Sequence, residues 1–378
     1  MPDKALASRL KSARESAGLP LTEAAKRLGY ANYQTLSSIE NAEREVRASE
    51  LVSMARIYYC NIQDFLAQGK SRKDLPFLWR NPPEIEDQRK EIESKIFFKC
   101  EQYHLLEQLL NIKAERGFIE TSLSDIRNNE SLNQLAARTR DLFDLGSRPA
   151  FALPRVLEEN YGVKILYLAL EKGSAVSMIH GTCGKTIIIN AKEAPWRRNN
   201  DLARELFHLM LWKILPPDQL TDKNYFSEIE KKAEKFASML LLPEEGIRQE
   251  TFNLWESQKK ITYSDLVDMA MDFGVSTKAL LYRLAYLKFI DWERADKIAK
   301  DEELAELSRE RRWIEKEAIK GSSRFITLAI RCLRKGLISR GKFAEIVEIN
   351  RVDIDAFIEN SGMMETEGKA ISIENLAA

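Results

Sequence analysis

The chain has 378 residues, and its 58 Lys and Arg balance its 58 Asp and Glu, so its formal net charge is zero. This length predicts two or more domains and a sizeable core. The balanced charge excludes a globally basic surface, so any nucleic-acid site must be local. The four cysteines lie far apart, which predicts neither a disulfide framework nor a Cys-x-x-Cys zinc site, and a reduced cytoplasm is the expected compartment. We expect no membrane span and no signal peptide, because no apolar run is long enough.

The first 70 residues predict five short helices around a small core. A helix at Thr22–Gly29 can end at its own glycine. The next helix, at Asn32–Asn41, turns Leu36 and Ile39 inward and leaves its polar residues outside. Two short helices joined by a tight glycine turn, the second polar on its outer face, are typical of a helix-turn-helix DNA reader.

This stretch resembles the Xre-type (phage-repressor-like) DNA-binding domain. The residues that carry the resemblance are Arg9-Leu10-Lys11-x-x-Arg14, Gly18-Leu19, Ala24, Leu28-Gly29, Thr35-Leu36-Ser37-x-Ile39-Glu40 and Leu51. One departure is Ala42, which stands where the family usually has glycine. The resemblance therefore implies a DNA-binding module over residues 1–70.

The resemblance also implies roles for single residues of that module. Base-edge contacts fall to Tyr33, Gln34 and Ser38, and phosphate or positioning contacts fall to Asn32, Ser37, Asn41 and Arg44. The alternative is a helical protein-docking module without DNA affinity. Glu43, Glu45 and Glu50 keep it open, because carboxylates near this surface weaken attraction to phosphate.

Residues 71–130 predict a connection between two larger parts. The stretch from 70 to 83 is rich in proline and carries the pair Trp79-Arg80, which indicates a linker that docks against another part of the chain. A long helix with mixed charges follows over Glu84–Gly117. This helix is either a dimer helix or an arm that joins the two domains.

Residues 131–290 predict a small α+β domain. Two helices, at Leu132–Phe143 and Leu153–Glu159, precede three strands at Val163–Leu168, Val176–Ile179 and Thr186–Ile189. The strands form a small sheet that packs on a following helix, so the whole chain is α+β and mostly α.

That following helix has the spacing of the zinc-protease motif His-Glu-x-x-His, in which two ligands lie one turn apart beside a glutamate base. Here Arg204 stands at the place of the first histidine, before Glu205 and His208. A zinc site needs lone-pair donors, and a guanidinium offers none. The sequence therefore has the frame of a metallopeptidase with one ligand replaced by a cation.

The region from 132 to 287 resembles the ImmA/IrrE family of metallopeptidases, in order and in spacing. The residues that carry this are Ile187-Ile188-Ile189-Asn190, Pro195, Arg197-Arg198, Leu202-Ala203-Arg204-Glu205-Leu206-Phe207-His208, Glu230-x-x-Ala233-Glu234-x-Phe236-Ala237 and Leu240-Leu241-Leu242-Pro243. The resemblance implies that Glu230 is the third ligand and that the fold is zincin-like. Two residues depart from the family, Arg204 and Glu234, the second in place of the usual asparagine.

We expect no metal here, and we interpret Arg204, His208 and Glu230 as vestigial ligand positions. Glu205 acts as a base only if the domain is active. Arg204 either bridges to Glu230 or Glu205 in a bidentate pair, or swings to solvent. Zinc returns as a cofactor only if another donor replaces the lost ligand. His180 and Cys183 in the predicted hairpin at 180–184 are the candidates.

Residues 291–378 predict a helical C-terminal extension. Glu293–Lys320 is dense in charge and predicts one solvated helix. Phe325–Asn360 resembles a second helix-turn-helix-like unit of the kind found at the end of long family members, from which we expect protein contacts before DNA contacts. The last dozen residues are expected to be frayed.

Together these patterns predict a cytoplasmic DNA-binding transcriptional regulator that uses a catalytically degenerate peptidase-like domain for partner binding or sensing. Proteins that resemble this arrangement often act as antitoxins of toxin–antitoxin modules, which implies a protein partner such as a toxin. A homodimer is expected on a double-stranded operator, because palindromic half-sites need two recognition helices. The alternatives are an active zinc endopeptidase that cleaves a repressor or toxin, and an assembly scaffold without DNA affinity.

Overall fold

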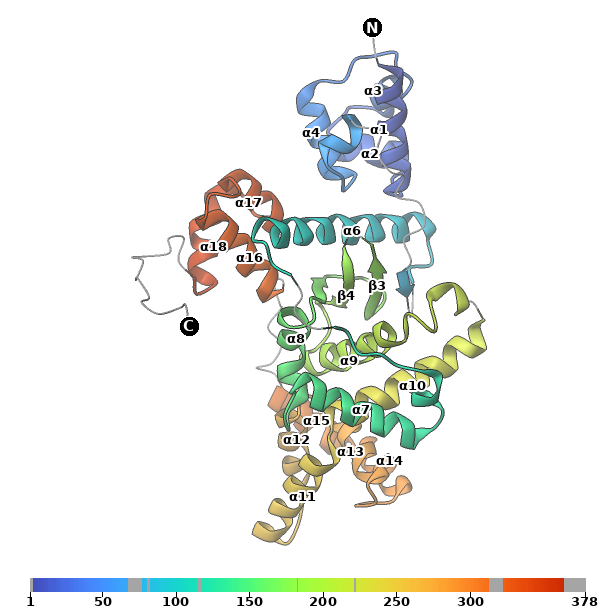
Figure 1. The fold of residues 1–378 in the computed structure, drawn as a ribbon, viewed down its shortest axis with the longest axis vertical. Helices are drawn as coiled ribbons and strands as arrows, with labels where there is room; N and C mark the ends of the chain where they lie inside the picture. Colours follow the sequence, from blue (N-terminus) through green and yellow to red (C-terminus); the bar gives the residue numbers. More distant parts are fainter. Residues whose placement is uncertain are drawn as a thin grey trace, which may run out of the picture.

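The protein is described from a computed structural model over residues 3–66, 77–79, 82–113, 117–181, 183–220, 222–312 and 322–363. Five short helices form one end of the molecule, the long helix α6 crosses beneath them, and a small sheet with many helices makes the body (Figure 1). The predicted class, α+β and mostly α, is confirmed. No helix in these ranges is long and apolar enough to cross a membrane. The residues expected to be frayed lie at the end of the chain, beyond 363.

The five predicted N-terminal helices are present and enclose a core of their own. Asp3 caps the first helix by accepting from two backbone N–H groups, and Asn32 caps the third by accepting from the Thr35 N–H. Such caps satisfy donors that the first turn leaves unpaired. The helices are α1 (Lys4–Ser16), α2 (Leu21–Arg27), α3 (Tyr33–Glu40), α4 (Ala48–Ile57) and α5 (Ile62–Leu66).

A buried ion pair fixes α3 against α1. The Arg14 guanidinium donates to both carboxylate oxygens of Glu40 at 2.8 and 3.0 Å, and also to the Leu19 carbonyl. A bidentate pair of this kind sets direction as well as distance. The turn after α3 contains Ala42 at φ +58°. This left-handed backbone favours glycine, so alanine at this position strains the turn.

Helix α6 (Glu86–Leu109) holds the N-terminal domain on the body. Arg27 pairs with both oxygens of Glu91 at 2.5 and 3.3 Å, and the Ser94 hydroxyl donates to the Ser16 carbonyl at 3.0 Å. Gly18 lies so close that a Cβ there would meet the Asp87 carbonyl oxygen at 2.2 Å. The structure has this helix as an arm that joins the domains, and its other predicted role, as a dimer helix, stays a prediction.

The sheet has four strands in the order β1-β3-β4-β2. β2 runs parallel to β4, while β3 is antiparallel to both β4 and β1. The three predicted strands are present, but the proline-rich linker of the prediction supplies a fourth, β1, which pairs Leu78 with Ser177. The strands are β1 (Phe77–Trp79), β2 (Lys164–Leu168), β3 (Ala175–His180) and β4 (Gly184–Asn190).

Both faces of the sheet are covered, since α6 lies on one face and α9 on the other (Figure 1). Alternation along the strands divides their side chains between two cores. On β3, Val176 and Met178 belong to the core beneath α6, whereas Ala175 belongs to the core around α9. The remaining elements of this part are η1 (Leu123–Ile126), α7 (Asn129–Phe143), α8 (Pro149–Glu159), α9 (Pro195–Leu211), η2 (Pro217–Gln219), α10 (Lys223–Leu241), α11 (Glu244–Gln258), α12 (Tyr263–Asp272) and α13 (Thr277–Tyr286).

The single helix predicted over Glu293–Lys320 is wrong within the described residues. Two helices occur instead, α14 (Trp292–Ala299) and α15 (Glu302–Arg311), and residues 313–320 of the prediction lie outside the described ranges. The Asp301 carboxylate accepts from the Glu303 backbone N–H and starts α15, so a capping residue divides the charged run.

The C-terminal unit comprises α16 (Ser323–Arg334), α17 (Arg340–Val347), η4 (Arg351–Asp353) and α18 (Ile354–Asn360), and it packs against α6. A buried polar network joins it to the body. Arg324 donates to the Tyr103 hydroxyl and to Glu107, and Tyr103 donates to Glu158. Burial raises the pKa of Glu158 to about 7, against the lowering effect of its hydrogen bonds from Ser322 and Tyr103.

Replacing Gly18 by Ala is expected to separate the N-terminal domain from α6, because the new Cβ overlaps the Asp87 carbonyl. Gly29→Ala is the matched control, since Gly29 also has positive φ but no atom lies within 4 Å of its Cβ position. In both variants, alanine at a positive φ should lower the free energy of unfolding by about 1 kcal/mol. Only Gly18→Ala should increase the radius of gyration in small-angle X-ray scattering. Equal scattering from the two variants would contradict the docked arrangement.

Candidate functional site

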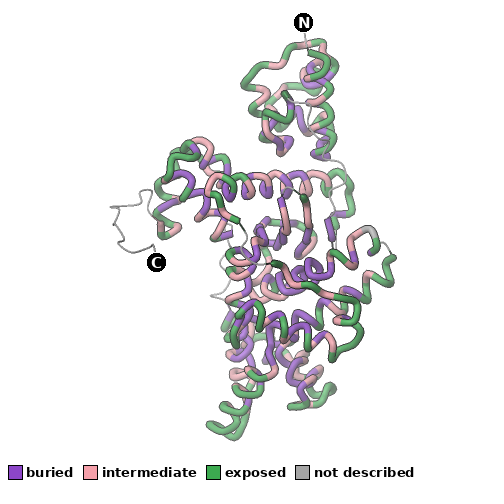
Figure 2. Tube along the Cα trace, viewed as in Figure 1, coloured by how far each residue is buried: buried purple, intermediate pink, exposed green. Residues whose placement is uncertain are grey.

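Helix α9 forms the centre of the body. Proline at its first position is compatible with a helix start, because proline lacks an N–H that would be unpaired there anyway. From Asp201 to Leu211 every residue is buried, and Figure 2 shows this helix inside the molecule. The helix lies between the sheet and α10. Its polar residues therefore have to find partners inside the protein.

Arg204 forms a bridge between α9 and α10. Its Nη2 atom donates to Glu230 Oε2, and its side chain is only 4% exposed. Of the two sequence-based alternatives, the structure has the bridge to Glu230 and not a guanidinium swung to solvent. The bridge is made to Oε2, and not as the expected bidentate pair, since Oε1 lies against His208. A second carboxylate, that of Asp201 on α9 itself, lies 3.8 Å from Arg204 Nη1.

The other oxygen of Glu230 is also engaged. His208 Nε2 lies 2.8 Å from Glu230 Oε1. Each of the three vestigial ligand positions is thus bound to another of the three. Zinc does not fit this arrangement, because Arg204 offers no lone pair and places a positive charge where the ion would lie.

The two departures from the family pattern lie together. Glu234, one turn after Glu230 on α10, has its Oε2 3.4 Å from Arg204 Nε. A carboxylate there adds a negative charge beside the buried guanidinium, which an asparagine would not do. Arg204 and Glu234 therefore complement each other, and the cation is surrounded by Asp201, Glu230 and Glu234.

Glu205, the glutamate that would act as base, is buried on the side of α9 that faces β3. Burial raises the pKa of Glu205, while the nearby His208 and the Ser177 hydroxyl lower it. The Oε2 atom of Glu205 and the Ser177 hydroxyl each lack a hydrogen-bond partner of standard geometry among the described residues. A buried, poorly solvated carboxyl of this kind is held closer to its neutral form.

The two substitute ligands considered from the sequence are not near this site. His180 packs edge-on against Phe97 of α6 at 5.1 Å between ring centroids, and Cys183 belongs to the core beneath α6. Both therefore lie on the face of the sheet opposite α9. Within the described part of the chain, no group of three or more His, Cys, Asp or Glu side chains is arranged to hold a metal ion.

The second candidate site is the outer face of α3, at the end of the molecule farthest from the body (Figure 1). Tyr33 is 49% exposed and Gln34 is also exposed, so both can reach a ligand. Ser38 donates to the Thr35 carbonyl at 2.9 Å, and Asn41 donates to the Ser37 hydroxyl at 3.3 Å. The predicted contact residues thus share one surface, with Asn32 at its start as the helix cap.

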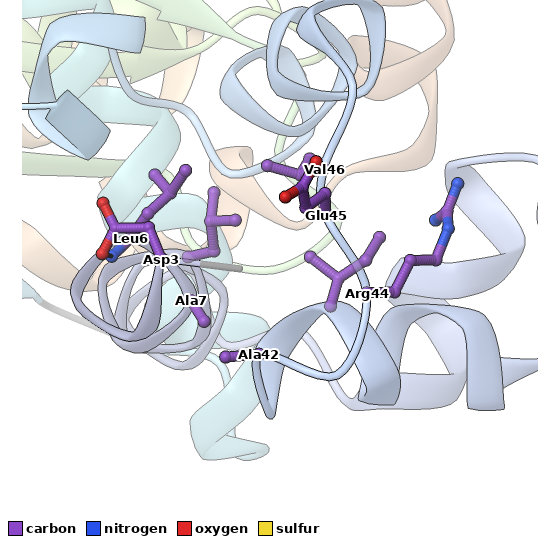
Figure 3. Close-up of a pocket in the computed structure, with 9 residues that line it drawn as sticks. Asp3, Leu6, Ala7, Ala42, Arg44, Glu45 and Val46 are labelled. Atoms are coloured by element: carbon purple, nitrogen blue, oxygen red, sulfur yellow. Dashed lines mark hydrogen bonds between the residues drawn. The ribbon is translucent and has the colours of Figure 1, made fainter. Parts of the chain in front are cut away.

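Arg44 is held by a neighbour. Its Nη2 donates to Glu50 Oε1 at 2.9 Å, an oxygen that also accepts from Tyr30. Figure 3 shows Arg44 directed away from a cavity of about 200 Å³ between α1 and the loop after α3, where Leu6, Ala7 and Val46 line the wall. Because the Glu50 carboxylate neutralises the charge of Arg44, Arg44 attracts a phosphate less strongly than a free arginine does.

Two family models match the parts of the chain that contain these two sites. Residues 5–61 match a family model described as a helix-turn-helix domain, and residues 158–285 match the peptidase M78 model described as an IrrE N-terminal-like domain. The chain joins a helix-turn-helix domain to an IrrE-like domain. A search of curated proteins gave no significant match. The domain pair expected from the sequence is therefore confirmed.

Two parts of the IrrE-like site were not found from the sequence. Asp201 contributes to the carboxylates around Arg204, and its position three residues before Arg204 on the same helix could have indicated it. Ser177 faces Glu205 from β3, and only the pairing of the strands brings it there. Nothing in the local sequence around Ser177 distinguishes it from any other strand serine.

Replacing Arg204 by Met is expected to destabilise the protein by roughly 3 kcal/mol, because it leaves buried carboxylates without their cation. Arg197→Met is the matched control on the same helix, since Arg197 pairs with Glu193 at the surface and should lose less than about 1 kcal/mol. Chemical denaturation measures both. Combining Arg204→Met with Glu230→Gln should cost less than the sum of the single changes. An Arg204→Met variant as stable as the control would contradict the bridge.

Proposed function

We propose that the chain is a cytoplasmic transcriptional regulator that binds operator DNA through α3, and that its IrrE-like domain binds a partner or a signal without hydrolysing peptides. The observation that carries the second half is the closed set of contacts between Arg204, Glu230 and His208. A peptidase needs these positions for zinc and for the water that zinc activates. Here they stabilise the fold instead.

The sheet edge beside Glu205 gives independent support. β1 pairs along β3 and sets Leu78 opposite Ser177, which faces Glu205. An extended peptide that approached this edge would need the backbone groups that β1 already uses. Phe77 and Trp79 are buried in the core beneath α6, and Trp79 donates to Glu93 at 2.8 Å. The edge is therefore covered by the chain itself.

The active zinc endopeptidase is the less favoured alternative. It needs a third donor beside His208 and Glu230, and the two candidates, His180 and Cys183, lie across the sheet. It also needs Glu230 released from Arg204. Cleavage of a partner protein that is abolished by Glu205→Gln would establish this alternative against our proposal.

The DNA-binding half rests on the exposed polar face of α3 and on its rigid placement by Arg14 and Glu40. α3 itself contains no lysine or arginine. One recognition helix with so little positive charge gives weak affinity, so we infer a homodimer that reads two half-sites. The alternative, an assembly scaffold without DNA affinity, predicts no shift of any upstream DNA in a mobility-shift assay.

The partner is, in our proposal, a toxin encoded beside this chain, so that the regulator acts as its antitoxin. This follows the arrangement of domains that such antitoxins share, a repressor-like domain joined to a large peptidase-like body. Copurification of the neighbouring gene product with the tagged chain tests it. Loss of growth inhibition when both are expressed would support the antitoxin role, and unrelieved toxicity would count against it.

Gln34→Ala is expected to weaken binding to the upstream DNA at least about fivefold, because a side chain that reads a base edge contributes about 1–3 kcal/mol. Gln63→Ala is the matched control, since Gln63 is an exposed glutamine of the same domain on α5. Footprinting followed by fluorescence anisotropy measures the affinities. Equal affinities for the two variants would remove α3 from the interface.

A further inference from the structure

A second cavity, of about 400 Å³, lies where α9, α13, α14 and α15 meet. It opens beside the first turn of α9, whereas Arg204 lies eight residues further along the helix, or about 12 Å at 1.5 Å per residue. The cavity is therefore separate from the site around Arg204. Its volume is within the range of cavities that hold small organic ligands.

The polar side chains of this cavity favour an anion. Lys278, Arg309 and Arg312 line it, and none of the described residues that line it is acidic. Arg312 is buried and donates to the Val275 carbonyl, whereas Lys278 and Arg309 are exposed at the mouth. In a chain of zero net charge, three cations around one hollow give a local positive potential.

Hydroxyl groups and a helix start lie beside these cations. Thr277 and Ser308 lie 3.2 Å apart through their hydroxyl oxygens, and both line the cavity. α13 begins at Thr277, and α9 begins at Pro195, next to the lining residue Ala194, which makes no side-chain cap. The uncapped start of α9 adds partial positive charge to that of the side chains, whereas at the start of α13 the Ser276 hydroxyl accepts from the Ala279 backbone N–H.

The remaining wall is apolar and aromatic. Trp196 lines the cavity with its indole ring, and the Arg312 guanidinium lies over that ring at 4.5 Å. Ala299, Leu304 and Ala305 complete this wall. A surface of this kind contacts a flat ring, and the adjacent cations contact a charged group attached to it.

We propose that this cavity binds a small organic anion that combines an aromatic ring with a phosphate or a carboxylate. Because Trp196 belongs to α9, the ligand contacts the helix that carries Arg204 and His208. The site thus gives the regulator a place for a small-molecule signal. The binding itself does not depend on the DNA-binding function proposed above, and each can fail without the other.

Isothermal titration of the full chain tests the proposal with four probes. Adenosine monophosphate and benzoate each carry a ring and an anion, adenosine carries the ring alone, and inorganic phosphate carries the anion alone. We expect at least one of the first two to bind at least tenfold more tightly than adenosine and phosphate. The two ring-containing anions also distinguish phosphate from carboxylate recognition.

Lys278→Glu and Arg309→Glu should each weaken binding of the preferred probe at least tenfold. Lys297→Glu is the control, because Lys297 is an exposed lysine of α14 outside the cavity and makes the same change of charge. All three positions are exposed, so folding should persist, which circular dichroism checks. The proposal is overturned if neither ring-containing anion binds more tightly than adenosine, or if the two cavity variants bind like the control.

Discussion

One buried cation, Arg204, determines what the IrrE-like domain can do. It lies among Asp201, Glu230 and Glu234, and His208 Nε2 lies 2.8 Å from the other oxygen of Glu230. The guanidinium thus performs the structural task that a divalent ion would have, since it holds α9 to α10 by charge and hydrogen bonds. It cannot polarise a carbonyl or lower the pKa of a water in the way a metal does. The residues around Arg204 therefore do not form a zinc site, which supports the non-hydrolytic role that we propose for this domain.

A continuous set of contacts connects the site around Arg204 with the helix-turn-helix domain. Ser177 faces Glu205 from β3, β1 pairs with β3, and Trp79 of β1 donates to Glu93 of α6. The same helix then holds the N-terminal domain through Glu91 and Ser94. The site around Arg204 and the N-terminal domain are thus joined through β3, β1 and α6.

Much of this could be predicted from the sequence, because the deciding residues belong to helices with strong local signals. The replacement of a ligand by Arg204, its bridge to Glu230 and the helix-turn-helix domain all follow from spacing and side-chain chemistry. β1 could not be predicted, since three residues between prolines are too short to show alternation and their pairing with β3 is non-local. The end of α14 and the start of α15 could not be predicted either. Asp301 caps α15 within a run of charged residues, where the sequence does not distinguish a capping aspartate from other acidic residues. The contact between Ser177 and Glu205 depends on strand register, which no local pattern specifies.

The most direct measurement of the central claim is the zinc content of the purified chain after incubation with zinc and removal of the excess. The account predicts no stoichiometric zinc in the natural sequence. The variant Arg204→His shows that the assay detects such a site, because it restores a second imidazole beside His208 and releases Glu230, and it should gain zinc. One zinc per chain in the natural sequence, lost in His208→Ala, would contradict the account. The residues around Arg204 would then form a metal site in spite of the arginine.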